Sequence, residues 1–264
     1  MIIDTHSKET MQKSVCEYFK ITETELYCLF DKFYNSSMEL EQAIAEYVSD
    51  NYSEPLEAVQ FYHLSRRLNG SNLEEGNNLY DLLLNKSPIS DFLAQYGITF
   101  AKEHDHLQLY RNSKLEKLKG NVSYLKWRMG CIPGDEDYCF NGFALRDRLQ
   151  YNTSYYNQLG FCPEFIGQLA QAINKESMIW DYRANSKYYC LEYLLPLGNI
   201  VIDGREYRKS QYGKSQELLV AFVLRLYNYW LNPKYSSDEG NVILRLNDND
   251  TMDKQYFVRA EEQK

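Results

Sequence analysis

Residues 58–65 have the sequence AVQFYHLS, which follows a helix-breaking segment that ends at Pro55. Aromatic, β-branched and other apolar residues dominate this stretch, so it predicts a strand in the core of a sheet. The Gly- and Asn-rich segment at 69–78 then predicts a loop. We therefore expect this strand to open an α+β main domain over residues 56–264.

The sequence before this strand has the periodicity of helices. Apolar residues recur at three- and four-residue intervals through most of the first fifty residues, as on one face of a helix. Thr22 and Glu25 have the spacing of a capping box, and Ser36 and Glu39 repeat it. These patterns predict three short helices that form an N-terminal helical unit over residues 1–52.

The main domain contains segments with the two-residue periodicity of strands and segments with the periodicity of helices. Strands are predicted at 98–100, 107–110, 122–129, 138–145, 178–182, 188–195 and 199–202, with a closing hairpin from 242–246 and 256–258. Helices are predicted at 79–84, 88–96, from Pro163 onward and after Ser215. The resulting fold class is α+β, with the small helical unit followed by a mixed, mainly antiparallel sheet domain with flanking helices.

The helix after Ser215 is strongly amphipathic. Leu218, Phe222, Leu226 and Trp230 recur at four-residue intervals. Because this apolar face must be buried against something, a homodimer formed through residues 215–230 is one expectation.

Composition narrows the classes of partner and compartment. Lys and Arg total 29 and Asp and Glu total 37, which gives a net charge of −8 and disfavours binding to nucleic-acid backbones. No apolar run has the length of a membrane span. The six cysteines are scattered without a CxxC pair and no apolar leader opens the chain, which favours reduced thiols in the cytoplasm.

Several signatures of enzymes are missing from the sequence. It contains no GxxxxGK[ST], GxGxxG, GxSxG or HExxH motif. His104-Asp105-His106 is the densest group of metal-ligand residue types, and on a strand the two imidazoles would share a face. A surface loop explains the same three residues, so no metal site is predicted.

His63 and Ser65 carry the most specific pattern. Alternation on a strand places both on one face, where both side chains can hydrogen-bond a diol. This His-x-Ser strand resembles the first core strand of ADP-ribosyltransferase-type folds, in which the pair lies against the ribose of NAD. The segment NGFALRD at 141–147, with Tyr151 after it, is similar to the Gly-aromatic strand and tyrosine of the same family. The resemblance implies NAD as cofactor and Tyr151 stacked on nicotinamide.

The family also requires a catalytic glutamate, and two residues are candidates. Glu217 has the family's local Ser/Gln-x-Glu spacing, but the residues after it predict a helix where the family has a strand. Glu192 lies in a well-predicted strand without the family's flanking residues. Both remain candidates for the residue that orients the ribose hydroxyl and stabilises the oxocarbenium-like transition state.

The alternative function is not enzymatic. The chain contains 24 tyrosines, whose rings suit contact surfaces. An aromatic-rich, acidic surface on an α+β scaffold can bind a protein partner through steering and contact area. The positions of Tyr62, Tyr138, Tyr151, Tyr155 and Tyr156 distinguish the two functions, since a closed pocket favours an enzyme and a flat exposed face favours a binding protein.

Overall fold

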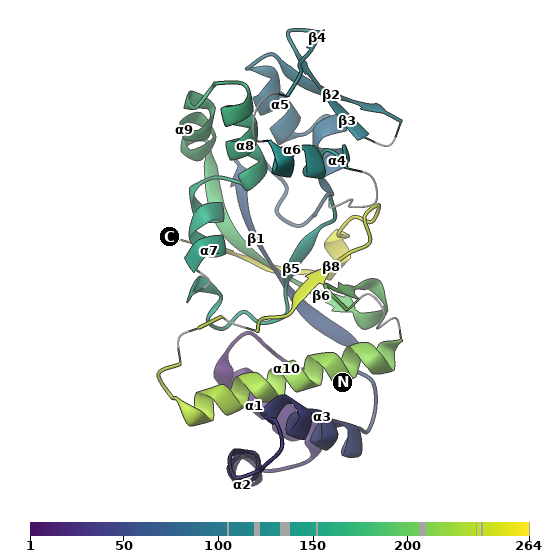
Figure 1. The fold of residues 1–264 in the computed structure, drawn as a ribbon, viewed down its shortest axis with the longest axis vertical. Coiled ribbons are helices and arrows are strands. Elements are labelled where there is room, and N and C mark those ends of the chain that lie inside the picture. Colours follow the sequence, from purple (N-terminus) through teal and green to yellow (C-terminus); the bar gives the residue numbers. More distant parts are fainter. Residues whose placement is uncertain are drawn as a thin grey trace. The chain divides into compact units, whose positions relative to one another are not determined.

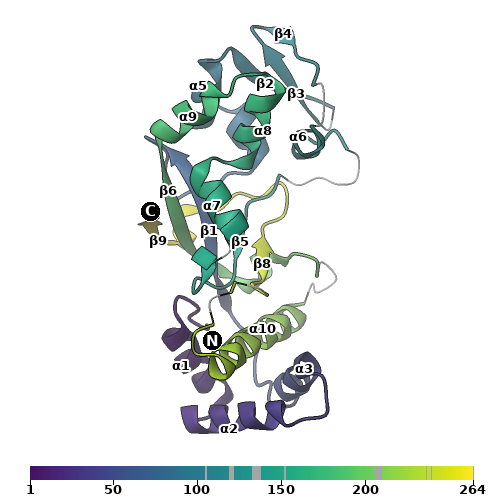
Figure 2. The same ribbon diagram turned by 60° about the vertical axis from the view of Figure 1, so that its left-hand side comes forward.

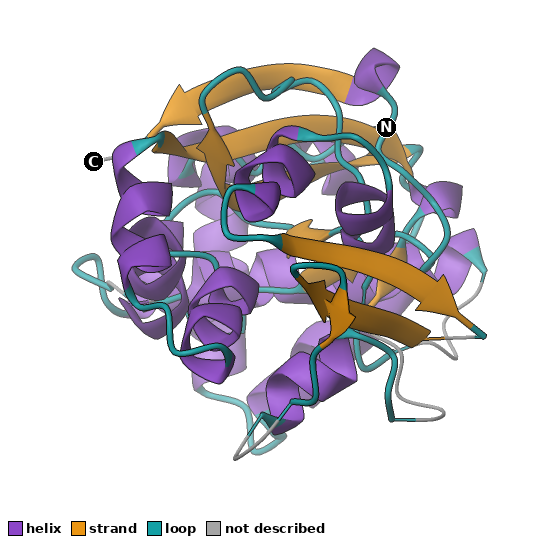
Figure 3. Cartoon of the chain, turned by 90° about the horizontal axis from the view of Figure 1, so that it is seen from above, coloured by secondary structure: helices purple, strands orange, loops and turns teal. Residues whose placement is uncertain are grey.

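The computed structural model describes residues 1–104, 106–118, 122–132, 138–151, 153–205, 210–235, 237–238 and 240–263. The chain forms two compact units. Unit 1 comprises Met1–Tyr62, Asn141–Asn152 and Glu192–Arg245, and unit 2 comprises His63–Phe140, Thr153–Leu191 and Leu246–Lys264. Helices and antiparallel strands make up the fold (Figure 3), and a helical segment precedes the sheet, which confirms the predicted α+β class. The domain boundary near residue 52 stays a prediction.

Unit 1 is built around one long helix. Its elements are α1 Lys8–Phe19, α2 Glu23–Tyr34, α3 Leu40–Asp50, β5 Asn141–Phe143, η1 Leu149–Tyr151, η2 Leu197–Asn199, β7 Val201–Ile202, α10 Gln211–Leu231 and β8 Ile243–Arg245. The three N-terminal helices pack along α10 (Figures 1 and 2), and they cover its apolar face. Phe222, Val223 and Leu226 of α10 are buried there. The apolar face is therefore buried within unit 1, and a homodimer through it stays a prediction.

The local sequence explains where these helices begin. Thr22 accepts a hydrogen bond from the backbone N–H of Glu25, and the Glu25 carboxylate accepts from the backbone N–H of Thr22, which confirms the first predicted capping box. The second predicted box is wrong. Helix α3 begins after Glu39 with no side-chain cap, and Ser36 instead accepts a hydrogen bond from the backbone of Met38.

The larger sheet contains two long strands, β1 Ala58–Leu68 and β6 Ser186–Pro196, which contribute residues to both units. The strand order is β7-β8-β5-β1-β6-β9. In unit 1, β5 pairs antiparallel with β1, where Phe143 lies opposite Tyr62, and β8 pairs antiparallel with β5 and β7. The strand predicted from residues 58–65 is thus an internal strand of the sheet.

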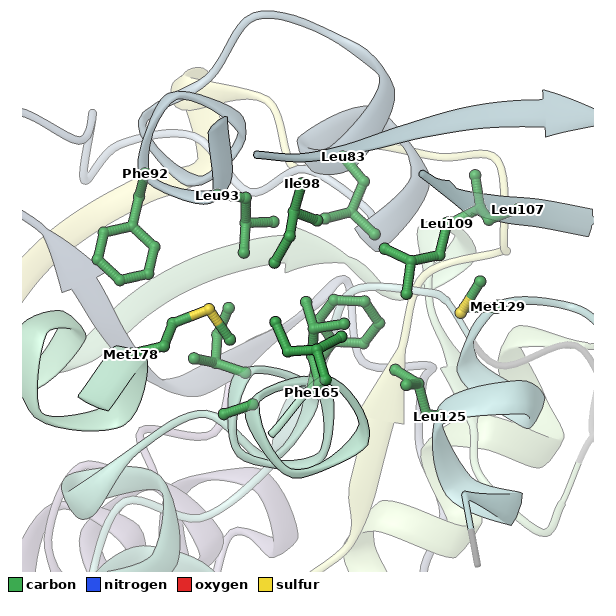
Figure 4. Close-up of a cluster of buried hydrophobic side chains, with 14 of the residues drawn as sticks. Leu83, Phe92, Leu93, Ile98, Leu107, Leu109, Leu125, Met129, Phe165 and Met178 are labelled. Carbon is green, nitrogen blue, oxygen red and sulfur yellow. The ribbon is translucent and has the colours of Figure 1, made fainter. Parts of the chain in front are cut away.

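Unit 2 encloses a core of its own. Its remaining elements are α4 Leu79–Leu84, α5 Pro88–Ala94, β2 Ile98–Glu103, β3 His106–Arg111, β4 Lys114–Leu115, α6 Ser123–Arg128, α7 Thr153–Phe161, α8 Glu164–Ala172, α9 Ser177–Ala184, η3 Lys254–Tyr256 and β9 Phe257–Glu262. The strands β2, β3 and β4 form a second, antiparallel sheet. Leu93, Ile98, Leu109, Phe165 and Met178 come from five different elements and point into one apolar cluster (Figure 4).

Arg66 of β1 joins several elements of unit 2. Its guanidinium donates to the backbone carbonyls of Gly160, Arg183 and Ser186 at 2.7 to 3.0 Å. Its Nε also donates to the hydroxyl of Ser186 at 2.9 Å. A charged side chain here fixes the ends of α7 and α9 against β6, because the carbonyls that terminate helices need donors.

Two predicted strands are helices in the structure. Residues 122–129 contain α6, and residues 178–182 lie in α9. In each case the buried apolar side chains are four residues apart, Leu125 with Met129 and Met178 with Tyr182, which is helical spacing. Segments this short fit the periodicity of a strand and of a helix equally well, so packing within unit 2 decides which one forms.

The predicted closing hairpin is also wrong. Strand β8 at Ile243–Arg245 pairs with β5 and β7, whereas β9 at Phe257–Glu262 is the neighbour of β6. The chain between them makes an isolated bridge from Met252 to Gly76.

Among the described residues, every helix is too short or too polar to cross a lipid bilayer.

A matched pair of glycine substitutions tests the packing of β5. A Cβ on Gly142 would lie 2.5 Å from the Phe61 ring and 2.7 Å from the carbonyl oxygen of Tyr62, and that backbone atom cannot move away. We expect Gly142→Ala to lower the free energy of unfolding by about 1–3 kcal/mol. Gly167, in the middle of α8, has open space, so Gly167→Ala should raise stability by up to about 1 kcal/mol. Urea denaturation measures both, and equal effects would contradict the pairing of β5 with β1.

Candidate functional site

Unit 1 contains a buried carboxylate on β6, within hydrogen-bonding distance of β1. Glu192 of β6 is 3% exposed, and its Oε1 accepts a hydrogen bond from Nε2 of Gln60 on β1 at 3.1 Å. Its other oxygen lies 3.3 Å from Nδ1 of His6. Burial of a carboxylate is costly unless polar groups meet its oxygens, and Gln60 and His6 supply such groups here.

The segment before α1 brings His6 to this carboxylate. The backbone N–H and the hydroxyl of Thr5 both lie within hydrogen-bonding distance of Oε1 of Gln60, and the hydroxyl also donates to the carbonyl of Ala144 at 2.6 Å. Thr5, Gln60, Glu192 and His6 thus form one polar network, which we call the Glu192 network. It anchors the N-terminal segment to β1, β6 and the end of β5.

The geometry of the Glu192 network suits acid–base chemistry. The His6 side chain is 30% exposed, whereas the Glu192 side chain is 4% exposed. A carboxylate next to Nδ1 orients the imidazole, and an oriented imidazole is a common acid or base in catalysis. The amide of Gln60 fixes the carboxylate in turn, so each group is held by the next.

Glu217, the other candidate carboxylate, has a different environment. It lies on α10, which confirms that the residues after it form a helix. Its Oε1 lies 3.1 Å from Nε of Arg205, and that arginine side chain is 50% exposed. An ion pair this open to water contributes little to the stability of the fold.

Tyr151 ends the short helix η1 and is 43% exposed. The guanidinium of Arg148 lies 5.4 Å from the centre of its ring. The Tyr151 ring in unit 1 is therefore accessible to a ligand. In the described part of the chain, no hydrogen bond or ring contact joins it to Glu192 or Glu217. Its role in stacking on nicotinamide stays a prediction.

His63 and Ser65 lie in unit 2, on the continuation of β1. Both are partly buried while Leu64 between them is buried, as expected for alternation on a strand. The His63 ring lies against Phe140, with 4.0 Å between ring centres and 33° between planes. Phe140 directly precedes β5. Binding of ribose by His63 and Ser65 stays a prediction.

The five tyrosines that were to distinguish the two functions do not form one group. Tyr62 and Tyr138 are core residues, with exposed fractions of 0% and 7%. Tyr151 and Tyr155 are exposed, and the hydroxyl of Tyr156 donates to the side chain of Gln263. The tyrosines are therefore divided between core packing and surface, and they favour neither function as a set.

The histidine pair near residue 105 borders the turn between β2 and β3. His104 has a left-handed backbone with φ of 55°, and His106 begins β3 opposite Glu103. The two imidazoles therefore do not share a strand face, because His104 is outside the strand. Asp105 lies outside the described residues.

His6 and Gln60 were missed by sequence reasoning. Glu192 interrupts the apolar stretch YYCLEYLL, and a charge within a core strand is a signal that a buried partner must exist. Nothing local in the sequence identifies His6 as that partner, because it precedes α1 and meets the carboxylate only through the tertiary fold.

No family model, curated protein or solved structure matches this chain.

No disulfide joins the six cysteines, and four of them are buried. Burial raises the pKa of the Cys162 thiol to about 11, so at pH 8 only about one thiol in a thousand is ionised. This is the opposite of what a nucleophilic cysteine requires, and it argues against cysteine catalysis at Cys162.

Thiol labelling measures the reactivity of each cysteine directly. In the native protein at pH 8, iodoacetamide should modify the exposed residues Cys28 and Cys131, with Cys28 faster because burial also raises the pKa of Cys131. Cys162 and the other buried thiols should react only after denaturation. Mass spectrometry of tryptic peptides gives the order, and rapid native labelling of Cys162 would contradict the packing described.

Proposed function

We propose that this chain is an NAD-using, ADP-ribosyltransferase-like enzyme in which Glu192 is the catalytic carboxylate. The observation that carries the proposal is the Glu192 network, a buried carboxylate held by Gln60 on one side and His6 on the other. The strand order supports it as well, because β1 lies between β5 and β6. The strands that carry the His-x-Ser, Gly-aromatic and glutamate segments are consecutive in one sheet.

The proposed reaction breaks the bond between the nicotinamide nitrogen and C1 of the ribose. Nicotinamide leaves with the bonding electron pair, and positive charge develops on the sugar. A fixed carboxylate stabilises that charge and accepts a hydrogen bond from a ribose hydroxyl. Water or a nucleophile on a target then adds to C1 and loses a proton, and we propose the imidazole of His6 as the group that accepts it.

Glu192 is preferred to Glu217 for a physical reason. A catalytic carboxylate stabilises a transition state best when it is fixed beforehand and shielded from water. Glu192 is held by two neighbours and is 3% exposed, whereas the Glu217 side chain is 27% exposed and its ion-pair partner Arg205 is 50% exposed. His63 and Ser65 as ribose ligands, and Tyr151 as the nicotinamide platform, complete the proposal.

Exposed aromatic residues in unit 2 favour a second candidate function, which is binding to a protein partner. Trp180 is 60% exposed, and its ring lies edge-on to Phe161 with 5.3 Å between centres. The guanidinium of Arg183 lies 4.9 Å from the Phe161 ring. Trp and Arg dominate the energetics of many interfaces, so these three residues support a contact surface on unit 2. The absence of disulfides supports a reducing compartment such as the cytoplasm.

Release of nicotinamide from NAD tests the enzymatic proposal. We expect the purified protein to release nicotinamide and Glu192→Gln to lose about a hundredfold or more in rate, because the amide cannot stabilise the developing positive charge. Glu217→Gln is the matched control and should stay within about twofold of the unaltered protein. His63→Ala should raise KM more than it lowers kcat.

Two results would overturn the proposal. One is a Glu192→Gln variant that is folded and turns over NAD at the original rate. The other is an unaltered protein that neither consumes NAD nor shows an NAD-dependent shift in melting temperature. Circular dichroism melting curves for each variant establish that the fold is intact.

A further inference from the structure

Strand β2 forms one edge of the smaller sheet in unit 2. The strand order is β2-β3-β4, so β2 pairs with β3 along one side only. An edge strand presents a row of backbone N–H and C=O groups to which a further strand can bind. The free side of β2 is therefore a place where the sheet can be extended.

The register shows which backbone groups of β2 face this free side. The backbone N–H of Asn112 donates to the carbonyl of Gly97 at 2.7 Å, and β2 continues from there in the same antiparallel register against β3. Because hydrogen-bonded and non-hydrogen-bonded pairs alternate in such a ladder, the backbone groups of Phe100 and Lys102 point away from β3. Among the residues that the structure describes, no hydrogen bond reaches these backbone groups.

A pocket of about 270 Å³ lies beside this edge. It is lined by three consecutive residues of β2, which are Ile98, Thr99 and Phe100, although their side chains alternate between the two faces of the strand. A pocket that touches residues of both faces lies at the edge of the strand. The rest of the lining comes from α4, α5 and the turn between them, and it includes Leu83 and Leu93, which lie near Ile98 (Figure 4).

We propose that this edge binds an extended peptide segment, which adds to the sheet as a further strand and places an apolar side chain in the pocket. We call the surface the β2 groove, and it consists of the free edge of residues 98–102 together with the pocket. The inference goes beyond the proposed function, because it concerns a surface of unit 2 and requires no NAD.

The size and lining of the pocket suit a single side chain. Sites for drug-sized ligands enclose roughly 300–1,000 Å³, and this pocket is smaller. Its lining is mainly apolar, and the two charged residues in it, Lys86 and Asp91, are opposite in sign. When a peptide adds to a sheet edge, main-chain hydrogen bonds give affinity and pockets for alternate side chains give specificity. The β2 groove offers both.

Lys102 indicates the charge of the peptide. Its side chain is exposed and shares a face of β2 with Phe100, since residues two apart lie on one face of a strand. The Lys102 ammonium lies 5.7 Å from the centre of the Tyr80 ring, and no ion pair neutralises it among the described residues. Opposite charges stabilise strand pairs when they face each other. The peptide that fits therefore carries an apolar residue opposite Phe100 and an acidic residue two positions away, opposite Lys102.

Selection of random peptides displayed on phage, with the full chain as bait, tests the β2 groove. We expect the selection to enrich peptides with an apolar and an acidic residue two positions apart. Fluorescence polarisation of labelled synthetic copies gives their affinities. Lys102→Pro should weaken binding about tenfold or more, because proline removes the outward N–H and leaves the hydrogen bonds to β3 in place.

Three further variants separate the contributions. Lys102→Gln keeps the N–H and removes the charge, so it should weaken the acidic peptides only about threefold. Ala94→Trp, at an exposed position in the pocket lining, should fill the pocket and weaken the enriched peptides about tenfold, because their apolar side chain is no longer buried. Leu115→Pro is the matched control on β4, the other edge of the same sheet, and should leave peptide binding unchanged.

The inference is overturned if the selection enriches no peptide, or if folded Lys102→Pro binds the enriched peptides as tightly as the unaltered protein. Circular dichroism melting curves establish the fold of each variant, and if Lys102→Pro does not fold, unchanged binding to folded Ala94→Trp overturns the inference instead. Peptide binding that is lost in these variants of a protein without NAD turnover would uphold the β2 groove and refute only the proposed function.

Discussion

The burial of the Glu192 carboxylate is the constraint on which the arrangement of unit 1 depends. A charge placed between two core strands has to be compensated, and the chain compensates it with Gln60 from β1 and with His6 from the N-terminal segment. These contacts join a residue near the start of the chain to one near residue 190. The same contacts that satisfy the charge also fix a carboxylate and an imidazole in one arrangement, which connects the stability of the unit with its proposed chemistry.

Helix α10 provides the second support of unit 1. Its apolar face is covered by α1, α2 and α3, and its buried Lys214 donates to the backbone carbonyls of Leu197 and Ile200 at 3.2 and 2.5 Å. Ser215 accepts a hydrogen bond from the backbone N–H of Leu56 at 2.8 Å, just before β1 begins. The N-terminal helices, the start of β1 and the end of β6 are thus tied to one helix, which keeps the Glu192 network in place.

The sequence predicted those features that depend on local periodicity. The amphipathic repeat through Phe222 and Leu226 and the capping box at Thr22 lie within single helices, so pattern alone identified them. Short apolar windows such as Met178–Tyr182 fit a strand as well as a helix, and only packing in unit 2 resolved them. The partner of β8 and the role of His6 depend on contacts between residues far apart in the chain, for which a single sequence carries no local signal.

The central claim is that Glu192 is a catalytic carboxylate and has more than a structural role. It is tested most directly by a crystal structure of the Glu192→Gln variant soaked with NAD, in which the slowed reaction leaves the cofactor intact. We predict uncleaved NAD with a hydroxyl of its nicotinamide ribose within hydrogen-bonding distance of the side chain at position 192. NAD bound away from that side chain, or not bound at all at millimolar concentration, would contradict it.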